Sequence, residues 1–115
     1  MIAIYARQSV EKEDSISIES QIEMCEYEAR GEEYVVYKDK GFSGKDTNRP
    51  EFQRMMQDIR QGKVHKVISY KLDRISRSLS DFVEILKVFE DYNVEFVSSQ
   101  EAFDTKSSYG QLVLK

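Results

Sequence analysis

Apolar and polar positions alternate along this chain in a pattern that predicts strands separated by helices. Four short apolar runs contain β-branched and aromatic residues and are bounded by polar or turn-forming segments, which is typical of buried strands. These runs occupy residues 2–6, 33–38, 66–70 and 94–99.

Apolar residues with helical spacing occupy the segments between the runs. Repeats at i, i+4, i+7 and i+11 predict a helix from about Ser15 to Ala29. A second helix is expected to start at Pro50, a residue favoured in the first turn, and to end before Gly62. The same spacing predicts a third helix over residues 80–92.

This alternation predicts an α/β domain. Helices of this length between strands indicate βαβ crossovers, so we expect a three-layer domain with a mainly parallel sheet of four to five strands and helices on both faces. The polar, glycine-bearing segment 39–48 is expected to be a surface loop. The last residues, YGQLVLK, lack a helix stop signal, and we expect them to begin a further helix that the chain does not complete.

Composition narrows the class of protein. The chain has 115 residues, 40% hydrophobic and 33% charged, as expected for one globular domain. No apolar run approaches the roughly 18 residues that span a bilayer, and the N-terminus lacks a signal-peptide pattern. The single Cys25 cannot form an internal disulfide, and with the lone His65 it makes a poor metal-ligand set. We therefore expect a cytoplasmic protein without a membrane partner, metal or cofactor.

The charge distribution is uneven. The formal net charge of −4 argues against a domain that holds nucleic acid by bulk charge alone. However, the segment 63–77 carries five Lys or Arg residues against the single acid Asp73. A local basic patch on an acidic domain and an ordinary solvated face both explain this segment.

Polar residues that could bind a ligand or take part in a reaction follow each predicted strand. The carboxyl ends of parallel strands share one edge of a sheet, so these residues are expected to lie near one another. The set comprises Arg7 and Ser9 after the first strand, Asp39, Ser43 and Arg49 after the second, Lys71, Asp73, Arg74 and Arg77 after the third, and Ser99 and Gln100 after the fourth. The edge contains no histidine and no glycine-rich phosphate loop.

Arginines gathered around a serine suit a phosphate. The guanidinium group binds phosphate oxygens in bidentate fashion, and several such cations can stabilise the charge of a phosphoryl-transfer transition state without a metal. A serine hydroxyl is a weak nucleophile, so its activation would have to come from the arginines or an aspartate. If a helix starts in KLDRISRS, Arg74 and Arg77 share one face and Asp73 lies near its start.

Each of these residues also has an ordinary explanation when it is taken alone. Arg7 could be a solvated strand-end residue, Ser9 a loop or cap residue and Asp73 a helix cap. Ser43, between Phe42 and Gly44, suits a turn. Tyr5 is expected to lie half in the core and half at its rim.

Four motifs, in order along the chain, resemble the catalytic domain of the serine recombinases, the resolvase/invertase superfamily. They are YARQS, DKGFSG, NRPEF and KLDRISRS, and the form of the middle two is most similar to large serine integrases and transposon recombinases. The resemblance implies a resolvase-like fold over residues 1–115, ending at the start of a long C-terminal dimerisation helix.

The resemblance also implies roles for individual residues. Ser9 would be the nucleophile that attacks a DNA phosphodiester to give a 5′-phosphoserine. Asp73 would be an acidic partner of the catalytic arginines. Arg7, Arg74 and Arg77 would be the phosphate-binding and activating arginines, with Arg49 the matching catalytic-site arginine after the loop. The accessory positions would be Tyr5, Gln21, Ser43 and Lys71.

For partners, the resemblance implies double-stranded DNA and self-association to dimers and tetramers of the full-length protein, with no metal or other cofactor. Because other domains would supply most DNA affinity, residues 1–115 alone are not expected to recombine DNA. Two alternatives stay open from the residues: a serine-dependent phosphohydrolase of small phosphate esters, and a non-catalytic signalling module on a flavodoxin-like sheet.

Overall fold

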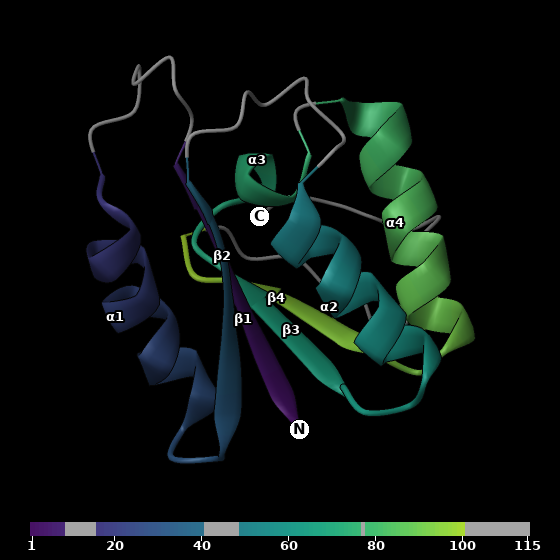
Figure 1. Ribbon diagram of the computed structural model, residues 1–115, viewed down its shortest axis with the longest axis horizontal. Coiled ribbons are helices and arrows are strands. Elements are labelled where there is room, and N and C mark those ends of the chain that lie inside the picture. The colour runs from purple at the N-terminus through teal and green to yellow at the C-terminus, as the bar shows by residue number, and fades with distance from the viewer. Residues whose placement is uncertain (9–15, 41–48, 77, 101–115) are drawn as a thin grey trace.

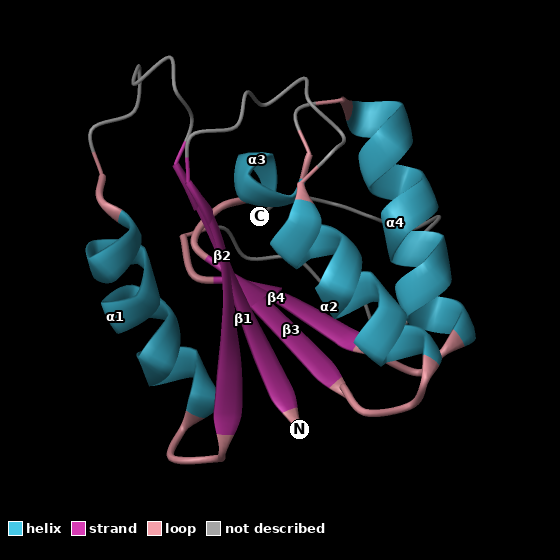
Figure 2. Ribbon diagram, viewed as in Figure 1, coloured by secondary structure: helices cyan, strands magenta, loops and turns pink. Residues whose placement is uncertain are grey.

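The computed structural model describes residues 1–8, 16–40, 49–76 and 78–100 (Figure 1). Four strands form a parallel sheet with the order β2-β1-β3-β4. Helix α1 covers one face, and α2 and α4 cover the other (Figure 2). The predicted α/β class and the three layers are confirmed. The elements are β1 (Ile2–Gln8), α1 (Ile18–Ala29), β2 (Tyr34–Lys40), α2 (Pro50–Arg60), β3 (Lys66–Ser69), α3 (Leu72–Ile75), α4 (Leu79–Asp91) and β4 (Glu95–Ser98).

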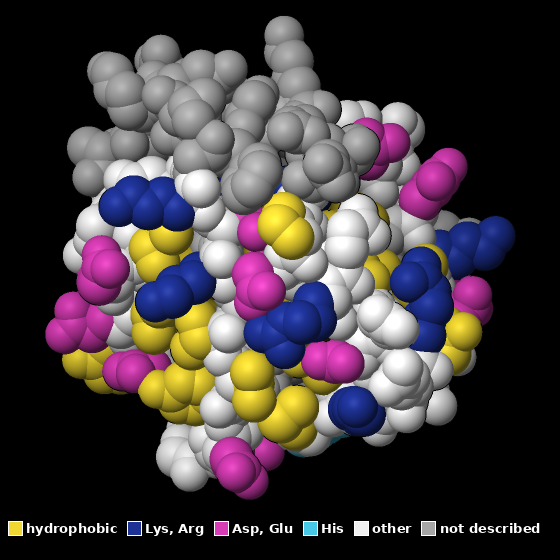
Figure 3. Space-filling model, in the orientation of Figure 1, with side chains coloured by type: hydrophobic (Ala, Val, Ile, Leu, Met, Phe, Trp, Pro, Cys, Tyr) yellow, Lys and Arg dark blue, Asp and Glu magenta, His cyan; other side chains and the backbone are white. Residues whose placement is uncertain are grey.

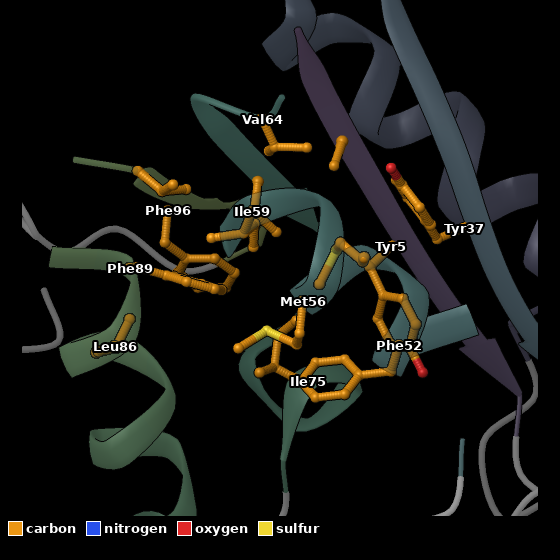
Figure 4. Packing of buried hydrophobic residues seen from close by; sticks show 14 of the residues in the cluster. Tyr5, Tyr37, Phe52, Met56, Ile59, Val64, Ile75, Leu86, Phe89 and Phe96 are labelled. Carbon is orange, nitrogen blue, oxygen red and sulfur yellow. The ribbon is translucent and has the colours of Figure 1, made fainter. Parts of the chain in front are cut away.

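The core has two parts, one on each face of the sheet. Side chains alternate between the faces of a strand, so β1 sends Ile2 and Ile4 to the α1 side and Tyr5 to the other. Tyr5 lies in the larger cluster with Phe52 and Phe89 of the two covering helices (Figure 4). The apolar sequence of β1 follows from its central place between two helical layers.

Two strands run further than their apolar pattern predicted. β1 and β2 pair along their whole length, with Arg7 opposite Asp39 and Gln8 opposite Lys40. The prediction of a surface loop was therefore wrong for residues 39 and 40, and the remainder of that loop, residues 41–48, lies outside the described residues. Asp39 is buried because it accepts hydrogen bonds from Tyr5 and from the first turn of α2.

The helix boundaries are set by local caps. α1 begins three residues later than predicted, where the Ser17 side chain accepts a hydrogen bond from the amide of Ser20 at 3.1 Å. At the start of α4, the Ser78 side chain likewise accepts a hydrogen bond from the amide of Asp81 at 3.3 Å. α4 is followed by Asn93 in a left-handed conformation (φ 58°), which is typical of the residue after a helix C-terminus.

A one-turn helix, α3, follows β3. It ends at Ile75, and Ser76 has an extended backbone. The helix therefore stops before residue 77, so the prediction that Arg74 and Arg77 share one face of this helix was wrong. Arg77 itself lies outside the described residues. α3 packs at the carboxyl end of β1 (Figure 1). None of the helices in the described ranges is long and apolar enough to cross a membrane.

Candidate active site

Three predicted arginines meet at the carboxyl edge of the sheet. All three are buried: Arg7 is 1% exposed to solvent, Arg49 is 6% exposed and Arg74 is 3% exposed. Buried cations are costly unless their donors are satisfied, so the contacts of these guanidinium groups explain how the site is built.

Arg7 reaches from β1 to the backbone of α3. Its Nη2 donates to the carbonyl of Asp73 at 2.8 Å, and its Nε donates to that of Arg74 at 3.4 Å. The last carbonyls of a helix lack partners within the helix and carry partial negative charge, so they are favourable acceptors for a cation. Arg7 is thus part of the interior rather than a solvated strand end.

Gln21 of α1 holds the backbone of Arg7. Its side-chain oxygen accepts from the Arg7 amide at 3.3 Å, and its Nε2 donates to the Arg7 carbonyl at 2.9 Å. On one side Arg7 is paired with β2, but on the other side β1 pairs with β3 only as far as Tyr5. On that second side the Gln21 carboxamide takes the place of a strand at Arg7. It fixes the part of β1 that leads to Ser9.

Arg49, directly before α2, is buried and connects the start of α2 to α3. Its guanidinium carbon lies 4.3 Å from the centre of the Phe52 ring and 5.6 Å from that of Tyr5. Its Nη1 donates to the Arg74 carbonyl at 3.1 Å and its Nη2 to that of Ile75 at 2.8 Å. A weaker bond of 3.4 Å runs from Nη1 to the Tyr5 hydroxyl.

Tyr5 and Asp39 complete this buried network. The Tyr5 hydroxyl donates to Asp39 Oδ2 at 2.8 Å, and Asp39 accepts from the amides of Glu51 and Phe52 at 3.1 and 3.0 Å. Arg49 stands at the N-cap of α2 without a capping bond from its side chain, so Asp39 supplies the cap from β2. Burial raises the pKa of Tyr5 far above its ordinary value, and Arg49 only partly offsets this. Tyr5 is therefore a neutral hydrogen-bond donor, and it is fully buried instead of lying at the rim.

Asp39 was placed at the sheet edge by its position after the second strand, but it was not singled out as a site residue. The available signal was a carboxylate directly after an apolar strand in a parallel sheet.

Asp73 and Lys71, beside the buried Arg74 network, are exposed residues of the site. Arg74 Nη1 lies 2.9 Å from Asp73 Oδ1, and the Asp73 side chain is 49% exposed. Lys71 is exposed, with its Nζ 5.9 Å from the centre of the Tyr70 ring. The structure thus pairs the Asp73 carboxylate with the Arg74 guanidinium.

Five other residues were predicted at this edge of the sheet. Ser9, Ser43 and Arg77 fall outside the described residues. Ser99 and Gln100 follow β4 and bond to the backbone of Ser69 and Tyr70, so they extend the β3–β4 pairing. Within the described ranges, no group of three or more His, Cys, Asp or Glu side chains could hold a metal. The cationic character of the edge suits an anionic group such as a phosphate.

Comparison with known proteins identifies the family. Residues 2–115 match the family described as "Resolvase, N terminal domain", so the chain belongs to this family. It is 38% identical to a putative DNA recombinase of Bacillus subtilis (strain 168), over 97% of this chain and 23% of that protein. It is 37% identical to the Tn917 resolvase of Enterococcus faecalis, over 64% of this chain and 39% of the resolvase. The chain therefore spans less than half the length of these relatives.

Solved structures give the same result. The N-terminal catalytic domain of TP901-1 integrase is 37% identical, with a TM-score of 0.79 over 95% of this chain and 84% of the integrase domain. A resolvase family site-specific recombinase from Streptococcus pneumoniae is 33% identical, with a TM-score of 0.69 over 86% of this chain and 71% of that chain. The resemblance to serine recombinases that the four motifs predicted is confirmed.

Proposed function

We propose that this chain is the catalytic domain of a site-specific DNA recombinase in which Ser9 is the nucleophile. The observation that carries the proposal is the convergence of Arg7, Arg49 and Arg74 at the end of β1, the strand that leads to Ser9. The names of the relatives, which include DNA recombinases, resolvases and invertases, support DNA as the substrate.

In the proposed reaction, Ser9 Oγ attacks a DNA phosphorus and gives up its proton as the bond to the 3′ oxygen breaks. The products are a 5′-phosphoserine and a 3′ hydroxyl, which takes up a proton. Attack of a 3′ hydroxyl on the phosphoserine rejoins the strand without an external energy source. Guanidinium groups stabilise the charge that develops on the phosphate. Arg7, Arg74 and Arg77 are the proposed groups, with Asp73 orienting Arg74 and Ser43 and Lys71 as accessory residues.

The proposed partners are double-stranded DNA and further copies of the protein, as dimers and tetramers, in the cytoplasm. Positive and negative side chains are interspersed on the described surface in Figure 3, so this face offers no extended basic field for DNA. This agrees with a catalytic domain whose DNA affinity is supplied mainly by other domains. Residues 1–115 alone are expected not to recombine a two-site plasmid.

The test is a covalent adduct between the complete protein and DNA that carries its recombination site. The wild-type protein should form an adduct that survives denaturation, and Ser9→Ala should form none. The matched control is Ser80→Ala, which removes an exposed hydroxyl of α4 and should leave the adduct unchanged. An adduct that persists in Ser9→Ala would show that another residue is the nucleophile.

The same variant separates the alternatives. A phosphohydrolase would cleave a small ester such as p-nitrophenyl phosphate in a Ser9-dependent way and form no DNA adduct. A signalling module of the receiver type would need an acidic metal-binding cluster at the strand ends, and the described part of that edge carries arginines instead.

A further inference from the structure

Helix α3 depends on contacts from outside itself. It has four residues, and a single helical turn is not stable in isolation. At its start the Arg74 amide donates to the Lys71 carbonyl at 3.1 Å, and at its end the Ser76 amide donates to the Leu72 carbonyl at 3.1 Å. The carbonyls of Arg74 and Ile75 accept from Arg49, and those of Asp73 and Arg74 accept from Arg7.

Arg49 is enclosed by α3 on one edge and by two aromatic rings from β1 and α2. The edge formed by its two Nη atoms faces the carbonyls of Arg74 and Ile75, and the rings of Phe52 and Tyr5 lie beside the guanidinium. Its Nε is buried and has no hydrogen-bond partner among the described residues. A guanidinium binds a phosphate through its Nη1–Nη2 edge or its Nε–Nη edge. In Arg49 the first edge faces backbone carbonyls and the Nε of the second is buried.

α3 also carries the paired side chains of Asp73 and Arg74, of which Asp73 is exposed to solvent and Arg74 is buried. Asp73 is half exposed and pairs with the Arg74 side chain, so the position of α3 sets the position of this pair. α2 fixes Arg49 in turn, because Asp39 caps α2 and holds the Tyr5 hydroxyl. A rigid connection thus runs from β2 through Arg49 to α3.

We infer that Arg49 is a positioning residue of the reaction: it locks α3 so that Arg74 and Asp73 are held against the scissile phosphate, and it does not bind that phosphate itself. This inference rests on the proposed function for the reaction, but its structural part concerns α3 alone.

The kinetic test compares charged and neutral DNA linkages in the complete protein. A methylphosphonate at the scissile position lacks the negative charge, so loss of an arginine that neutralises this charge matters less there. Misplacement of catalytic groups by about 1 Å can cost on the order of 100-fold, and we expect a loss of that order in adduct formation by Arg49→Ala. The loss should be the same, within about threefold, on both linkages. A loss that shrinks by more than this on the neutral linkage would overturn the inference.

The structural test uses amide hydrogen exchange and needs no DNA. In Arg49→Ala the Ser76 amide should lose protection while amides in the middle of β1 keep theirs. Unchanged protection of Ser76 would also overturn the inference. Arg49→Lys, which can reach one carbonyl at a time, should fall between wild type and Arg49→Ala in both measurements. It also provides a folded variant if Arg49→Ala does not fold.

The control is Arg60→Ala, which removes an exposed cation from the last turn of the same helix and should leave adduct formation and exchange at wild-type values. The two proposals fail separately. Absence of any wild-type adduct on ordinary DNA would refute the proposed function, whereas the exchange result for Ser76 still decides the role of Arg49 in α3.

Discussion

The Tyr5 hydroxyl donates a 2.8 Å hydrogen bond to Asp39, and this pair joins the two paired strands β1 and β2 to the first turn of α2. Asp39 thereby serves two purposes at once. It caps a helix whose own N-cap residue, Arg49, makes no capping bond, and it satisfies a phenol in the core.

Replacement of Asp39 is expected to destabilise the fold. In Asp39→Ala, loss of a helix cap costs about 1 kcal/mol, and a buried hydroxyl without an acceptor costs about 1–3 kcal/mol more. Urea denaturation should therefore show a free energy of unfolding lower by about 2–4 kcal/mol. Asp91→Ala, at an exposed position at the end of α4, is the control and should stay within about 0.5 kcal/mol of wild type. An equal result for the two variants would contradict the dual role of Asp39.

Gln21 is expected to matter through the backbone that it holds. Gln21→Ala leaves the amide and carbonyl of Arg7 without their partner, a loss of about 1–3 kcal/mol in the free energy of unfolding. Hydrogen exchange should be faster at the Arg7 amide than in wild type, with β3 unchanged. Gln57→Ala, which is exposed on α2, should change neither quantity. If the Arg7 amide stayed as protected as in wild type, the bond to Gln21 would not be what shields it.

The sequence pattern predicted the architecture because the core imposes it. All four apolar runs are strands and the three periodic segments are helices, since burial on one or both faces requires those periods. The same reasoning stopped both β1 and β2 two residues early. Arg7 and Asp39 are polar, and their burial is explained by particular hydrogen-bond partners, which hydropathy does not register.

The site was predictable in location and not in its contacts. The rule that parallel strands share a carboxyl edge placed Arg7, Arg49 and Arg74 together. However, α3 is a single turn that is held by guanidinium groups from distant segments of the chain. The helix propensity of its own residues therefore does not predict it. For that reason the sequence placed Arg49 at this edge without indicating its partners, which include the backbone carbonyls of Arg74 and Ile75.

Stability at alkaline pH should report the buried Tyr5. Its pKa is raised by burial above the ordinary value of 10.0, so below that pH both the folded and unfolded chains keep the proton. Above it the unfolded chain releases the proton and the folded chain does not, so stability falls by about 1.4 kcal/mol per pH unit for this group. Denaturation between pH 10 and 11.5 should therefore show a shallower pH dependence for Tyr5→Phe than for wild type. Identical slopes would mean that Tyr5 ionises as easily in the folded protein as in the unfolded chain.

The reactivity of Cys25 measures how often α1 separates from the sheet, because this thiol is buried between them. Burial, together with Glu28 and Glu26, raises the pKa of its thiol to about 12, and the side chain is 0% exposed. Because the thiolate is the reactive form, iodoacetamide at pH 8 should modify the native protein only through unfolding. Since Cys25 is the single cysteine of the sequence, mass spectrometry reads the modification directly. The rate should rise steeply across the urea transition and reach that of a free thiol in unfolded protein. Prompt modification without urea would instead indicate that α1 opens from β1 and β3 while the rest of the fold persists.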